Sequence, residues 1–121
     1  MKLHRFGFFP ELRHGDEDGI SIKTLMSDTA RSNEAEQAQY LENGVVLIAC
    51  AGVVKDVLNP LSGIIGSPHI LTDGVWAWPK DLAYYVKKYH VKLPDEFIQH
   101  MKNNGWNPPD ETEIDLSELE M

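Results

Sequence analysis

The dipeptide Asp73-Gly74, which lies between two short apolar runs, limits the fold of this chain more than any other feature. The runs are His69–Leu71 and Val75–Trp78, and Asp-Gly at such a boundary is typical of a tight β-turn. Side chains alternate along a strand, so Trp76 and Trp78 fall on one face. We therefore predict a β-hairpin that carries both tryptophans on the same side of a sheet.

Two helices are predicted after the hairpin. The first covers Lys80–Tyr89, with Pro79 at its first position. Its apolar stripe has helical spacing and consists of Leu82, Tyr85, Val86 and Tyr89. The second covers Asp95–Asn103, opened by Pro94 and ended by Gly105. Because the link between them is short, we expect a C-terminal αα-hairpin.

An earlier segment predicts a third helix and the strand that follows it. Asn33 and Glu36 have the spacing of a capping box, which indicates a helix over Glu34–Glu42. Gly44 is expected to end this helix in a left-handed conformation. The run Val45–Ala51 is apolar throughout and rich in β-branched residues, which is typical of a central strand buried on both faces.

Together with a first strand over Leu3–Phe9, these elements predict an α+β fold. We expect a small mixed sheet of three to five strands, containing the β-hairpin, and about three helices that lie mostly on one face. Residues 1–107 are expected to form one globular domain, because 121 residues suit a single domain. Residues 108–121 contain six acidic and no basic side chains and are predicted to be a mobile acidic tail.

The balance of charge restricts the partners. The formal net charge is −8, which disfavours binding to nucleic acid or to an anionic membrane and attracts a basic protein. The alternative is that the acidity only keeps the protein in solution. The single cysteine, Cys50, excludes an internal disulfide and is expected to be buried. No secretory signal or membrane-spanning run is visible, so we expect a cytoplasmic protein.

No motif in the sequence predicts catalysis, a cofactor or a metal site. The five histidines do not form a metal-ligand spacing, and no nucleophile elbow or phosphate loop occurs. We therefore expect a protein that is not an enzyme. A small enzyme of unrecognised type remains an alternative, with an active site assembled from residues far apart in the sequence, such as His69, Asp73 and His90.

Gly44–Met101, about half of the chain, contains a set of short motifs that resembles a family of small bacterial proteins. The motifs are Asp56-Val57-Leu58-Asn59-Pro60, Ile64-Ile65-Gly66, Leu71–Pro79, Leu82–Val86, Tyr89-His90-Val91 and Leu93-Pro94. The family comprises immunity partners of contact-dependent or other polymorphic toxins. The resemblance implies a stoichiometric inhibitor without chemistry of its own. Many such toxins are basic nucleases, to which an acidic inhibitor is complementary.

The leading hypothesis is therefore a non-enzymatic immunity protein that neutralises a cognate basic toxin by binding it. The alternative to this is a subunit or scaffold protein, in which the aromatic hairpin is a surface for self-association or assembly and a homo-oligomer forms. Trp76 is either an exposed contact or a cover for the sheet. The candidate partner-binding residues are Asp16, Glu17, Asp18, Trp76, Tyr84, Asp110, Glu111 and Glu113.

Overall fold

The computed structural model describes residues 1–13 and 15–121; His14 lies outside the described residues. Its α-helices are α1 (Glu34–Glu42), α2 (Leu82–Tyr89) and α3 (Asp95–Asn103). Its strands are β1 (His4–Arg5), β2 (Val45–Ile48), β3 (Val54–Lys55), β4 (Ile64–Gly66), β5 (Ile70–Thr72) and β6 (Trp76–Pro79). Short 3-10 helices cover Ile22–Leu25 (η1), Pro60–Ser62 (η2), Glu111–Glu113 (η3) and Leu116–Glu118 (η4). No helix among the described residues has both the length and the apolar character needed to cross a bilayer.

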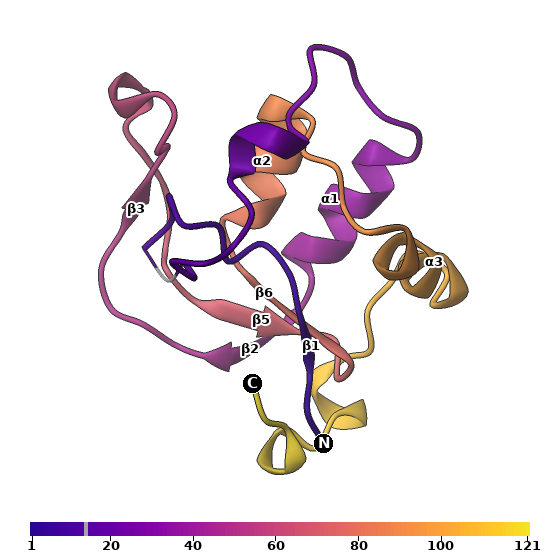
Figure 1. Ribbon diagram of the computed structural model, residues 1–121. Helices are drawn as coiled ribbons and strands as arrows, with labels where there is room; N and C mark the ends of the chain where they lie inside the picture. The colour runs from indigo at the N-terminus through magenta and orange to yellow at the C-terminus, as the bar shows by residue number, and fades with distance from the viewer. Residues whose placement is uncertain (14) are drawn as a thin grey trace.

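The larger sheet is mixed and has the strand order β1-β6-β5-β2. Strands β5 and β6 form the predicted antiparallel hairpin, in which Thr72 pairs with Ala77 and Gly74 has a φ of 93°. Strand β1 runs parallel to β6, and β2 runs antiparallel to β5. Strands β3 and β4 form a separate two-stranded sheet that projects from the body (Figure 1). The predicted α+β class and mixed sheet are thus confirmed.

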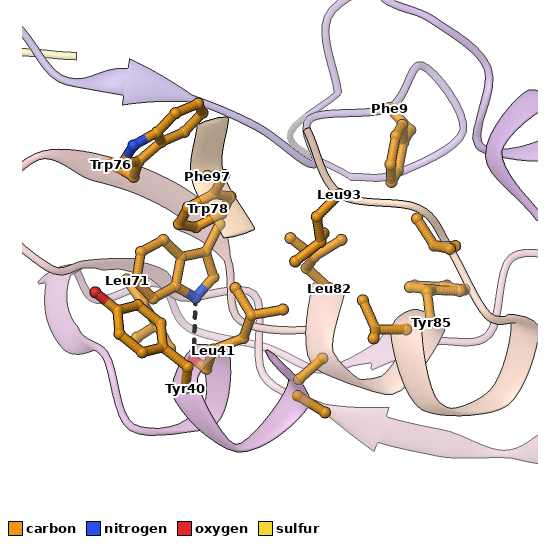
Figure 2. Close-up of a cluster of buried hydrophobic side chains, with 14 of the residues drawn as sticks. Phe9, Tyr40, Leu41, Leu71, Trp76, Trp78, Leu82, Tyr85, Leu93 and Phe97 are labelled. Carbon is orange, nitrogen blue, oxygen red and sulfur yellow. Dashed lines mark hydrogen bonds between the residues drawn. The ribbon is translucent and has the colours of Figure 1, made fainter. Parts of the chain in front are cut away.

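The main core lies between the four-stranded sheet and the helices (Figure 2). Trp78 is fully buried, and its indole N–H donates a 3.0 Å hydrogen bond to the carbonyl of Leu41 in α1. Trp76 stacks on Phe97 of α3, with ring centroids 4.4 Å apart. Both tryptophans therefore contribute to the same face of the sheet, as predicted, and both serve to cover it.

The opposite face of the sheet carries a smaller apolar cluster, Leu3, Phe8, Ile70 and Ala77. Leu119 and Met121 at the C-terminal end pack against it. Backbone hydrogen bonds fasten that end to the N-terminus: the amide of Leu3 donates to Glu120 over 2.7 Å, and the amide of Glu120 donates to Met1 over 2.8 Å. Residues 118–121 thus lie beside the N-terminus, while the mobility of residues 108–121 in solution and the domain limit at residue 107 stay predictions.

Strand β2 is not the central, doubly buried strand that its apolar sequence predicted. It occupies the edge of the sheet and pairs only with β5, so Val46 and Ile48 are each 42% exposed. The strand also ends at Ile48, which leaves Cys50 beyond it and only partly buried. The prediction was wrong because the hairpin strands β5 and β6 occupy the two central positions of the sheet, which an apolar run alone cannot reveal.

Several local details also differ from the predictions. Asn33 adopts a left-handed conformation without a side-chain cap, and Glu34 instead accepts a hydrogen bond from the amide of Arg31. Gly44 is needed for close packing rather than for a left-handed turn, because an added Cβ would lie 2.5 Å from the Trp78 ring. Pro79 ends β6, and α2 begins only at Leu82.

Candidate partner-binding surface

The acidic C-terminal segment presents carboxylates that no described basic side chain neutralises. Asp110, Glu111 and Glu113 are exposed around η3, at the end of the molecule where the two termini lie (Figure 1). Hydrogen bonds from the side chain and backbone of Thr112 lower the pKa of Asp110, so its carboxylate stays ionised. None of the six acidic side chains in residues 108–121 forms an ion pair with a described residue. Their charge is available to a partner.

The acidic loop that follows β1 is partly neutralised from within. Asp16 forms a 3.2 Å ion pair with Arg5, whose guanidinium also lies over the ring of Phe8. Glu17 and Asp18 are exposed and have no ion pair among the described residues. This loop therefore offers two free carboxylates, fewer than the C-terminal segment.

The two aromatic candidates, Trp76 and Tyr84, are buried and half-buried, respectively. Trp76 is 6% exposed and stacked against Phe97, so it covers the sheet and is not an exposed contact. Neither tryptophan of the hairpin is thus exposed for self-association, and the assembly of the chain stays a prediction. Tyr84 is half-buried, and its hydroxyl donates a 2.7 Å hydrogen bond to Asp56. The acceptor, Asp56, is one of three buried aspartates; the others are Asp73 and Asp81.

Asp56 is 1% exposed and accepts four hydrogen bonds. Its Oδ1 accepts from the backbone amides of Leu58 (2.8 Å) and Asn59 (3.1 Å), which holds the turn after β3. Its Oδ2 accepts from the hydroxyls of Tyr84 (2.7 Å) and Tyr89 (2.6 Å) on α2. The carboxylate therefore fastens the β3–β4 sheet to the helix.

A lysine completes this arrangement. The Nζ of Lys88 lies 3.5 Å from Oδ2 of Asp56 and over the rings of Tyr84 and Tyr89. Burial by itself would raise the pKa of Asp56, but the donated hydrogen bonds outweigh it and hold that pKa below the usual 3.8. Burial and the bond to Asp56 raise the pKa of Tyr89 to about 12. The carboxylate is thus ionised and the phenol neutral at neutral pH.

Asp73 forms a second anchor with the same plan. Its Oδ1 accepts from the amides of Val75 (2.9 Å) and Trp76 (2.7 Å), which holds the hairpin turn. Its Oδ2 accepts a 2.7 Å bond from the hydroxyl of Tyr40 in α1 and lies 3.2 Å from Nε2 of His100 in α3. Burial, followed by the bond to Asp73, raises the pKa of Tyr40. This carboxylate therefore joins the hairpin to two helices.

The three residues of the alternative enzyme hypothesis have separate partners. His69 accepts a 2.9 Å bond from the amide of Cys50, and His90 lies 2.8 Å from a carboxylate oxygen of Glu34, whereas Asp73 pairs with His100. Within the described residues, no group of three or more His, Cys, Asp or Glu side chains could hold a metal ion.

One exposed apolar projection was not predicted from the sequence; we call it the arm and define it as residues 53–66. Its exposed hydrophobic side chains are Val53, Val57, Leu61 and Ile64, and Leu61 at the tip is 95% exposed. One signal was present in the sequence: between Glu42 and Asp73 the only charged residues are Lys55 and Asp56. A stretch so poor in charge is unusual in a chain of net charge −8 and is the part of the surface where apolar side chains gather.

Comparisons with known proteins gave no match: no protein-family model, no curated protein and no solved structure matches the chain.

Proposed function

We propose that this protein is a non-enzymatic immunity protein that binds and neutralises a basic toxin domain, with one inhibitor bound to each toxin. The observation that carries the proposal is the set of unneutralised carboxylates in residues 108–121. An exposed acidic segment of this kind attracts the lysines and arginines with which a nuclease would hold phosphates. The resemblance of Gly44–Met101 to immunity partners of polymorphic toxins supports the same function.

The way this segment is held also supports the proposal. Backbone hydrogen bonds to Met1 and Leu3, and the apolar contacts of Leu119 and Met121, fix its course along the body. A charged segment that is fastened to the body near its end loses less conformational entropy on binding than a free tail does. We therefore assign the first contact with the toxin to the acidic side chains around η3, Asp110, Glu111 and Glu113.

The test measures binding to the product of the neighbouring gene and that product's activity. We expect a complex with equal numbers of the two chains and complete loss of toxin activity at that ratio. Replacement of Glu111 and Glu113 by glutamine should slow association by about tenfold, because steering depends on charge. The matched control is Asp28→Asn with Glu36→Gln, which removes two exposed charges outside residues 108–121.

Salt provides an independent measurement. Raising the ionic strength from about 0.05 M to about 0.5 M should slow association markedly, because salt shortens the Debye length and screens the attraction between the two proteins before they touch. An association rate that changes neither with salt nor with the glutamine substitutions would contradict the electrostatic mechanism. A neighbouring gene product that neither binds nor loses activity would contradict the proposed function itself.

A second candidate function, a subunit of a larger assembly, is favoured by the arm. Four apolar side chains exposed on one projection are characteristic of a protein–protein contact rather than of an isolated surface.

A further inference from the structure

The arm holds an apolar side chain away from the body in a defined position. The amide of Leu61 donates a 3.2 Å hydrogen bond to the side chain of Asn59, which caps η2. Lys88 of α2 donates a 3.0 Å hydrogen bond to the hydroxyl of Ser62, and Asp56 secures the turn before it. Leu61 is thus 95% exposed on a turn that is tied to a helix on both sides. A leucine presented in this way is preorganised for contact with another molecule.

The same arm also contains a hollow that such a side chain could fill. A depression of about 250 Å³ lies beside β3, and its apolar lining is formed by Val53, Val54, Val57 and Pro60. A volume of this size exceeds that of a leucine side chain. The projecting tip and the receiving hollow therefore belong to one segment of the chain. Surfaces of this kind are self-complementary, which is the requirement for an interface about a twofold axis.

The charges around the arm permit two copies to approach there. Most of the acidic side chains lie outside residues 43–72, in which Asp56 is buried and Lys55 is the one exposed charge. The hollow is bordered by two basic side chains, Arg13 and Lys55, and by two acidic ones, Asp56 and Asp81. Two molecules of net charge −8 can therefore approach through their arms with little repulsion between exposed carboxylates.

We propose that the arm is the interface through which two copies of this chain form a symmetric dimer, with Leu61 of each copy entering the hollow of the other. The dimer does not depend on the proposed function, because it leaves the acidic residues around η3 outside the interface. A stable interface buries about 800 Å² on each partner, against a surface of 6723 Å² for the whole chain. Contacts by Val53, Val57 and Ile64 would add to those of the tip.

The test is sedimentation velocity of the full chain from about 1 µM to about 100 µM. We expect a concentration-dependent dimer, which Leu61→Glu weakens by at least tenfold in its dissociation constant, because the charge would enter an apolar hollow. Val57→Lys, in the hollow itself, should have the same effect. The matched control is Ile20→Glu, which places the same charge on another exposed hydrophobic residue, 66% exposed and outside the arm. Circular dichroism and thermal unfolding establish that each variant folds.

Salt separates this interface from toxin binding. Added salt screens the repulsion between two chains of net charge −8 and should strengthen the dimer, whereas it should weaken an electrostatic complex with a basic partner. A wild-type chain that remains monomeric at about 100 µM in about 0.5 M salt would overturn the proposal. So would a dimer that Leu61→Glu leaves unchanged. If the chain is monomeric and Leu61→Glu weakens binding of the toxin, the arm belongs to the toxin interface and the dimer is excluded.

Discussion

Asp56 and Asp73 form similar sets of hydrogen bonds in different surroundings. Each carboxylate uses Oδ1 to hold two backbone amides of a turn and Oδ2 to accept a tyrosine hydroxyl from a helix. Each also has a nitrogen-bearing side chain near Oδ2, Lys88 at 3.5 Å and His100 at 3.2 Å. They differ in what they join, because Asp73 connects elements of the main core and Asp56 fastens the arm to its outside.

This difference implies that similar hydrogen bonds contribute to different properties. Tyr40, the partner of Asp73, is fully buried, so its hydroxyl has no access to water if the carboxylate is lost. Tyr84 and Tyr89, the partners of Asp56, are half-buried and can turn toward solvent. We therefore expect Asp73 to determine the global stability of the domain and Asp56 to determine the order of the arm.

The strongest test of this comparison is Asp73→Ala, which we expect to have the largest effect. It leaves two backbone amides and the Tyr40 hydroxyl without an acceptor, at a cost of about 3–5 kcal/mol in the free energy of unfolding. Chemical denaturation measures the loss. Asp73→Asn, which keeps an acceptor for the turn, should lose less. A loss below about 1 kcal/mol for the alanine variant would show that the core does not depend on this carboxylate.

Asp56→Ala should have a smaller and local effect. Its tyrosine partners regain water, so we expect a loss of about 1–2 kcal/mol that is concentrated in the arm. Hydrogen–deuterium exchange should accelerate in residues 53–66 and stay slow in β5 and β6. Uniform acceleration across both sheets would contradict the division between the two anchors.

Removal of single hydroxyls sharpens the comparison. Tyr40→Phe leaves Asp73 and the side chain of Asn104 without their 2.7 Å and 2.9 Å hydrogen bonds inside the core. Tyr89→Phe leaves Asp56 with the hydroxyl of Tyr84 as a remaining donor. We expect the Tyr40 variant to lose about 1 kcal/mol more stability than the Tyr89 variant in denaturant unfolding. Equal losses would mean that burial does not distinguish the two sites.

Acid should release the arm from α2. The folded pKa of Asp56 is lowered from 3.8, so its contribution is present above that value and is lost as the pH falls through the folded pKa. Proteolysis by an acid-active protease should reach residues 53–66 in the wild type only when the pH falls below the ordinary aspartate value of 3.8. In Asp56→Asn the arm should already be cleaved above that pH, across the whole range in which the protease is active. Protection of the wild-type arm throughout this range would argue against the carboxylate as its fastening.

The smallest expected effect appears in alkali. Burial and Asp56 raise the pKa of Tyr89 from 10 to about 12, so the stability it provides is present below pH 10 and lost as the pH rises through about 12. Ultraviolet titration of phenolate should show this ionisation shifted toward the usual tyrosine value in Asp56→Asn. An unshifted titration in that variant would separate Tyr89 from the anchor.

Local sequence signals predicted two of the helices and the β-hairpin. The prediction for β2 failed because it depended on the position of the strand in the tertiary structure. The helices over Glu34–Glu42 and Asp95–Asn103 have the predicted bounds, because apolar periodicity and breaking residues are local properties. The edge position of β2 depends on which strands fill the centre of the sheet. Its apolar composition could not distinguish a buried centre from an exposed edge.

The two anchors were beyond prediction for a related reason. Asp56 lies 28 residues from Tyr84, and Asp73 lies 33 residues from Tyr40. The Asx-type turns that the carboxylates form are local and suggested by Asn59-Pro60 and Asp73-Gly74, but the tyrosine partners are chosen by the packing of α1 and α2. The exposure of the candidate acidic residues required no such information, because charged side chains in polar segments are rarely buried.

The adjacency of the two ends of the chain has a practical consequence. Met1 donates its terminal amine to the carbonyl of Glu118 over 2.6 Å, so the first and last residues are neighbours. A short glycine linker could close the backbone into a ring, and new ends could then be opened at Gly63, which has open space around it. Such a rearranged polypeptide would keep the sheet intact while placing its free ends, or a reporter attached to them, beside Leu61.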